Sequence, residues 1–126
     1  MSLMKYTQKK CDDLLSPIII KQSPRCLFYG INEKCTGNTQ VAHHHCHKSK
    51  SLILRYDFKN LIPLCHHCHL MLHFNESFWA SKVVQIKGLK WFAYIEKTKN
   101  KLMVGVDKID YEKVYKRLDR KLKSLL

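Results

Sequence analysis

The stretch His43–His73, HHHCHKSKSLILRYDFKNLIPLCHHCHLMLH, organises the whole chain. It contains all eight histidines of the sequence and three of its six cysteines, and no other part of the chain is so concentrated in these residues. Imidazole and thiolate are the side chains that zinc and related ions prefer as ligands in proteins. The stretch therefore predicts metal binding, and we expect two sites, one structural and one catalytic.

The cysteines predict the structural site. Cys65 and Cys68 form a C-x-x-C pair that one tetrahedral ion can close. Cys26 and Cys35 lie upstream at a wider spacing, in a turn-rich segment over residues 25–39 that a metal would help to order. The two pairs together could form a four-cysteine zinc site. The alternative for Cys26 and Cys35 is two unrelated buried thiols.

Two short strands and a helix are expected around these ligands. Residues 39–46 can form the first strand, residues 61–64 its partner, and residues 66–75 the helix. His69 and His73 are four residues apart on that helix, so they share one face and could hold one ion together. The alternative is a pair of surface histidines.

Before this core, apolar residues recur at helical spacing over residues 7–22, with Cys11 expected in the core. A proline inside a helix removes a hydrogen bond. Pro17 therefore predicts either a kink or a helix that ends near Leu15 and continues as an extended segment over residues 18–21. Residues 1–3 resemble an added leader before Met4, and we exclude them from the fold.

After this core, Asn75 or Ser77 can cap a helix that breaks at Gly88 and resumes to residue 95, with its aromatic side chains packed in the core. Residues 101–106 are expected to be extended or a loop. Asp110 is a typical N-cap for a last helix to residue 125, which has one apolar face and many basic residues.

The charge of the chain favours a polyanionic partner. A net charge of +13 and a pI near 9.6 point to nucleic acid, although a merely basic protein is the alternative. Arg55 could contact a phosphate or form a salt bridge with Asp57, and the basic face of the last helix could contact phosphates or only solvent. The candidate nucleic-acid contacts are Arg55, Lys48, Lys50, Arg117, Arg120 and Lys121.

The six cysteines and the N-terminal sequence indicate the cellular compartment of the protein. No continuous apolar segment suits a signal peptide or a membrane span, so we expect a soluble cytoplasmic protein that makes no membrane contact. In the reducing cytosol, cysteines at these spacings indicate metal binding in preference to disulfides.

The histidines suit phosphodiester hydrolysis. That reaction needs a placed base to deprotonate water and a divalent ion to stabilise charge on the phosphate and the leaving oxygen. A neutral histidine is a suitable base at physiological pH, and His44 can be that base. One ion held by His43, His69 and His73 would keep open positions for phosphate oxygens and water, as a catalytic site requires.

At these residues the chain resembles the HNH (ββα-metal, or His-Me finger) endonucleases. Their pattern of a histidine pair, a central asparagine and a helix with two histidines matches His43-His44, Asn60, His69 and His73. The C-x-x-C pair directly before that helix is similar to the zinc-stapled branch of the family.

A closer likeness is to the NinG/Rap group of phage recombination nucleases. It is carried by Val41-Ala42-His43-His44, Leu54-Arg55-Tyr56-Asp57 and residues 60–68, and it continues weakly through residues 86–89 and 115–125. The resemblance implies metal-dependent cleavage of DNA, in that group of branched recombination intermediates, in the host cytoplasm for a phage-encoded protein.

The resemblance also implies roles for single residues. His44 would be the general base, Asn60 would order the loop that positions it, and His43, His69 and His73 would hold the catalytic ion. The general HNH spacing, counted back from Asn60, also allows His45 as the base with His44 as a ligand, and both assignments stay open. The remaining histidines are expected to be exposed or to support the site, namely His47, His66 and His67.

We therefore expect one α+β domain over residues 1–126, with a ββα-metal (HNH) core and zinc knuckle over 26–75 between helical segments over 7–25 and 76–126. The expected function is endonuclease cleavage of DNA with a structural zinc and a catalytic Mg, Mn or Zn ion, and a homodimer is left open. One alternative is a non-catalytic zinc-knuckle protein that only binds nucleic acid. Another is a zinc-stapled protein-interaction domain. The first alternative does not need the helical histidine pair, and the second predicts no affinity for nucleic acid.

Overall fold

The computed structural model describes residues 5–48, 50–101 and 109–126, and the predicted leader over residues 1–3 lies outside them. Two short helices open the fold, α1 (Gln8–Asp12) and α2 (Leu15–Gln22). Pro17 is the third residue of α2, where its missing N–H would have no partner inside the helix. The predicted kink or extended segment over residues 18–21 is therefore wrong, because the break comes earlier, at residues 13 and 14.

A two-stranded antiparallel sheet follows, made of β1 (Val41–His44) and β2 (Leu61–Leu64), with His43 opposite Ile62 and His44 opposite Leu61. Both strands were predicted, although β1 is shorter than residues 39–46. The connection between them holds a one-turn helix, α3 (Leu52–Arg55), and a short 3-10 helix, η1 (Phe58–Asn60). These two turns fix the path of the backbone beside β1.

Four helices complete the described part of the chain, namely α4 (His66–Phe74), α5 (Glu76–Lys87), α6 (Leu89–Lys99) and α7 (Tyr111–Ser124). The predicted break between α5 and α6 is confirmed at Gly88, whose φ of 97° lies in the region that favours glycine. Asp110 caps α7 as predicted, since its side chain accepts a hydrogen bond from the backbone N–H of Lys113. The predicted extended segment or loop over residues 101–106 falls almost wholly outside the described residues.

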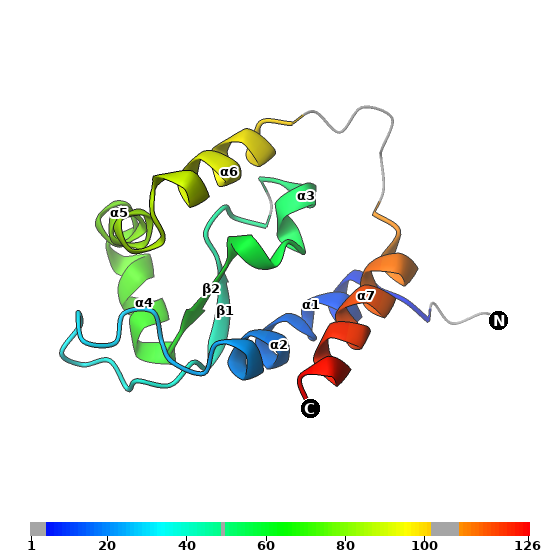
Figure 1. Cartoon of the computed structure of the whole chain (residues 1–126), viewed down its shortest axis with the longest axis horizontal. Helices are drawn as coiled ribbons and strands as arrows, with labels where there is room; N and C mark the ends of the chain where they lie inside the picture. The colour runs from blue at the N-terminus through cyan, green and yellow to red at the C-terminus, as the bar shows by residue number, and fades with distance from the viewer. Residues whose placement is uncertain (1–4, 49, 102–108) are drawn as a thin grey trace.

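Figure 1 shows the small sheet between two groups of helices, with α1, α2 and α7 on one side and α4, α5 and α6 on the other. The helices bury three apolar clusters. One joins the 26–35 segment to the sheet, α4 and α5; another joins α1, α2 and α7 to the sheet; the third lies between α3 and α6. Trp79 and Trp91 pack against the first cluster and Cys11 is buried in the second, as predicted, whereas Phe78 is 47% exposed. The α+β class is thereby confirmed.

Candidate metal centres

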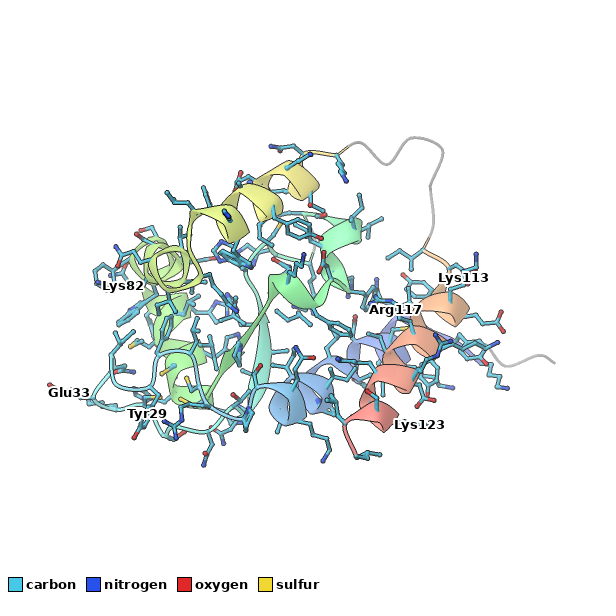
Figure 2. The ribbon with its side chains drawn as sticks, in the orientation of Figure 1. Tyr29, Glu33, Lys82, Lys113, Arg117 and Lys123 are labelled. Carbon is cyan, nitrogen blue, oxygen red and sulfur yellow. The ribbon has the colours of Figure 1, made fainter. Side chains whose placement is uncertain are left out.

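Four cysteines meet beside the start of α4. The sulfur atoms of Cys26, Cys35, Cys65 and Cys68 all lie within 4.8 Å of one another, and those of Cys35 and Cys65 are 3.9 Å apart. Zinc–sulfur bonds of about 2.3 Å place tetrahedral sulfurs about 3.8 Å from one another, so the spacing fits a zinc ion. Figure 2 shows the sulfur atoms gathered between the N-terminal end of α4 and the preceding loop. The four residues could hold a structural zinc.

Local backbone geometry brings Cys65 and Cys68 together, and longer-range backbone hydrogen bonds bring Cys26 and Cys35 to them. Cys65 is the N-cap of α4, and its sulfur accepts a hydrogen bond from the backbone N–H of Cys68 at 3.3 Å. The sulfur of Cys35 accepts from the N–H of Gly37, also at 3.3 Å. Cys26 and Cys35 reach Cys65 and Cys68 because the N–H of Leu27, the residue after Cys26, donates to the carbonyl of Pro63 in β2. The wide spacing of Cys26 and Cys35 is thus closed by tertiary pairing.

The thiols of this cluster differ in acidity. Burial raises the pKa of Cys26 to about 11 and raises that of Cys68 further. Burial also raises the pKa of Cys65, but N–H donors of Cys68 and Thr36 outweigh burial and lower it to about 6. Zinc binds thiolates, so an ion bound here would displace protons from Cys26 and Cys68. The cluster is closed, because three of its four side chains are buried.

Three histidines meet at a second place, on β1 and α4. Ring nitrogens of His43, His69 and His73 all lie within 4.8 Å of one another, and the Nε2 atoms of His69 and His73 are 3.1 Å apart. Metal–nitrogen bonds of about 2.05 Å place tetrahedral nitrogens about 3.3 Å apart, so this spacing also suits one ion. The three residues line one open cavity of about 360 Å³, whereas three of the four cysteines are buried and Cys35 borders a different cavity.

Two of these three histidines are held in the neutral form that can bind a metal ion. Burial, followed by the nearby His69 and His73 rings, lowers the pKa of His43 to about 3. Burial and His73 lower the pKa of His69 as well. At neutral pH the His43 and His69 rings therefore carry a free lone pair for an ion.

His44 lines the same cavity and has a fixed tautomer. Its Nε2–H donates to the backbone carbonyl of Arg55 at 2.9 Å, which leaves Nδ1 as the nitrogen with a lone pair. Burial lowers the pKa of His44, so the ring is neutral at physiological pH. These two features are what a general base requires.

Asn60 holds the backbone that orients His44. Its side chain is fully buried, accepts from the N–H of Cys46 at 2.7 Å, and donates to the carbonyls of Cys46 and Leu54 at 2.9 and 3.3 Å. Cys46 follows β1, and Leu54 immediately precedes Arg55, whose carbonyl contacts His44. One amide therefore ties both ends of the segment that positions the His44 ring.

The structure places His45 elsewhere. Its ring lies against Trp91, with ring centroids 4.8 Å apart, and lines a different cavity together with Lys50 and residues of α6. His45 is thus separated from the three convergent histidines, and it is His43, not His44, whose ring nitrogen groups with those of His69 and His73. His47, expected to be exposed or supporting, is half-exposed but lines the His43 cavity, as the exposed Lys48 also does.

Arg55 has neither of its two predicted roles, because it pairs with Asp12. It is 8% exposed, and it donates to Asp12 of α1 at 3.2 Å from Nε and at 2.7 Å from a terminal nitrogen. Tyr56 donates to the same carboxylate at 2.7 Å. The expected salt bridge to Asp57 is therefore wrong, and a phosphate contact is unsuited to a buried side chain whose charge Asp12 neutralises. Nothing in the sequence pattern singled out Asp12, which also lines the histidine cavity.

Several basic residues of α7 are engaged by partners within the protein. Arg117 donates to the carbonyl of Tyr56 at 2.7 Å, and Lys116 and Lys123 pair with carboxylates on the same helix. Arg120 is exposed and Lys121 is partly buried. Figure 2 shows Lys113, Arg117 and Lys123 along this helix. Lys50 is exposed beside the second cavity.

We compared the chain with family models, curated proteins and solved structures, and none matches it. Within residues 5–48, 50–101 and 109–126, no helix is long and apolar enough to cross a lipid bilayer.

Proposed function

We propose that this chain is a metal-dependent HNH endonuclease that hydrolyses DNA phosphodiesters. The observation that supports the proposal is the convergence of His43, His69 and His73 in one open cavity, with the oriented and neutral ring of His44 beside them. A purely structural site has no use for an open side or for a fourth imidazole. The order of β1, β2 and α4 agrees with a ββα-metal core.

Each residue has a distinct part in the proposed reaction. His43, His69 and His73 would hold a divalent ion, which when bound supplies positive charge to the phosphate and leaves positions for water. His44 takes a proton from the attacking water at Nδ1, because Nε2 already donates to Arg55. Asn60 keeps that carbonyl in place through Leu54. Three imidazoles favour Zn or Co over Mg as the ion.

DNA is the proposed partner. The net charge of +13 gives long-range attraction to a polyanion, and Lys48 lies at the cavity itself. The resemblance to phage recombination nucleases makes branched DNA the substrate class to compare first with plain duplex. Arg120, Lys121 and Lys50 would contribute through the general field.

A nicking assay tests the proposal. Supercoiled plasmid and a four-way junction are incubated with the protein and Mn²⁺, Co²⁺, Zn²⁺ or Mg²⁺. We expect cleavage that His44→Ala lowers by about 100-fold or more. The matched control is His45→Ala, the neighbouring histidine in the other cavity, which should keep most of the activity.

One result would decide against this function, and another against the assignment of its base. If the metal-loaded protein shifts DNA in a gel but never cuts it, the four-cysteine centre supports a non-catalytic nucleic-acid-binding protein instead. If His45→Ala abolishes cleavage and His44→Ala does not, the base is assigned to the wrong residue and the alternative register holds.

A further inference from the structure

One imidazole in the catalytic cavity has no role in the mechanism above. His47 lies shortly after β1 and lines the cavity together with the three ligand histidines and His44. Its Nε2 is 2.5 Å from Oε1 of Glu76, the first residue of α5. Both side chains are 46% exposed. A carboxylate on one ring nitrogen fixes the orientation of the ring and leaves the other nitrogen free to meet substrate.

Hydrolysis of a phosphodiester also needs an acid. The attacking water gives up a proton, and the sugar oxygen that leaves must gain one. Among residues 5–48, 50–101 and 109–126, the titratable side chains that line the cavity besides the three ligands and His44 are Asp12, His47 and Lys48. Asp12 already accepts hydrogen bonds on both carboxylate oxygens. A lysine ammonium holds its proton much more tightly than an imidazolium does, which makes it the poorer acid.

We propose that His47 is the general acid of the reaction and that Glu76 positions it. The inference rests on the proposed nuclease function. As the bond between water oxygen and phosphorus forms and the bond between phosphorus and the sugar oxygen breaks, the proton of water goes to Nδ1 of His44. The proton on Nδ1 of His47 goes to the leaving sugar oxygen. Glu76 holds Nε2–H throughout, so the His47 ring keeps one orientation.

A substrate with a better leaving group isolates the proton transfer from His47 to the leaving oxygen. A thiolate leaves without needing a proton, so a DNA in which sulfur replaces the bridging sugar oxygen makes an acid unnecessary. The end groups of the products first establish which sugar oxygen leaves, and the sulfur is placed at that position. Cleavage of the oxygen and sulfur substrates is then measured with Mn²⁺ for the wild-type chain and for His47→Gln.

We expect His47→Gln to lower kcat on the oxygen substrate by about 100-fold with little change in KM, and to cleave the sulfur substrate at close to the wild-type rate. Glu76→Gln should give a smaller loss that the sulfur substrate also restores. The matched control is His66→Gln, an exposed histidine of α4 that lines neither cavity and should cleave both substrates normally.

The outcomes separate this inference from the function on which it rests. An equal loss on both substrates shows that His47 supports folding or phosphate binding, and it overturns the inference while the nuclease stands. Full activity of His47→Gln on the oxygen substrate overturns it as well. A wild-type chain that cleaves neither substrate overturns the nuclease function and the acid together.

Discussion

The two candidate metal centres share α4 and differ in what surrounds them. The cysteine centre is at the N-terminal end, with three of its four ligands buried and its sulfurs held by backbone N–H groups. The histidine centre lies further along the helix and faces a cavity of about 360 Å³. A closed ligand set suits an ion that holds a fold, and an open one suits an ion that meets substrate. The free energy of unfolding should therefore depend on the first centre far more than on the second.

Loss of the cysteine centre should lower the free energy of unfolding more than any other change. A structural zinc contributes about 10 kcal/mol or more of binding free energy, which is comparable to the whole stability of a small domain. We expect Cys68→Ser, or removal of zinc by a strong chelator, to abolish the cooperative unfolding transition measured by circular dichroism. The matched control is Cys11→Ser, the same change at a buried cysteine outside the cluster, which should cost about 2 kcal/mol. A Cys68→Ser protein that unfolds like this control would show that the cysteines hold no structural ion.

Substitution of Asn60 should have the next largest effect on the free energy of unfolding, because Asn60 connects the strands to the segment that orients His44. Asn60→Ala removes the side-chain partner of the N–H and carbonyl of Cys46 and one of the donors to the carbonyl of Leu54, which keeps the N–H of Asp57. Buried polar groups left in this way should cost about 3 kcal/mol in urea unfolding. Nicking should also fall, because the Arg55 carbonyl is no longer held at His44. Activity that is unchanged after such a loss of stability would mean that the His44 tautomer is fixed by something else.

Asp12→Asn should have a smaller effect, at about 2 kcal/mol, because it leaves the nearly buried guanidinium of Arg55 without a counter-charge. Burial raises the pKa of Asp12, but hydrogen bonds from Arg55 and Tyr56 outweigh it and keep the pKa below 3.8. A lowered folded pKa stabilises the protein above the unfolded value, and this stabilisation is lost only as the pH falls through the folded value. The difference between wild type and Asp12→Asn should therefore stay constant from pH 7 to about pH 5. Unfolding curves in which the difference already narrows over that range would contradict the ion pair.

The sequence could predict the parts of both centres that depend on local spacing. His69 and His73 are one helical turn apart, and Cys65 and Cys68 are the N-cap and first turn of the same helix. The place of His43 in the histidine centre could also be predicted, because the sequence predicts β1 as a strand beside β2. These ligands need only a correct helix and a correct strand.

The parts that sequence reasoning could not reach depend on contacts between distant segments. Asp12 and Arg55 are 43 residues apart, and only the packing of α1 against the connection between the strands brings them together. His47 and Glu76 are 29 residues apart, and they meet because the residues after β1 pass close to the start of α5. No periodicity marks either pair. The error at Pro17 has a local cause, because a proline in a first turn and a proline inside a helix look alike until the helix start is known.

The smallest effect on stability should come from the histidine centre. His73 is exposed, and the three imidazoles line an open cavity, so His73→Ala removes little buried surface and should change the free energy of unfolding by about 0.5 kcal/mol or less. The same substitution should abolish nicking, because His43 and His69 alone cannot hold the ion firmly against water. Metal analysis should show one ion per chain lost and the cysteine-bound ion retained. If His73→Ala instead unfolds the protein, both centres are structural, and the division of labour along α4 on which the nuclease proposal depends would have to be given up.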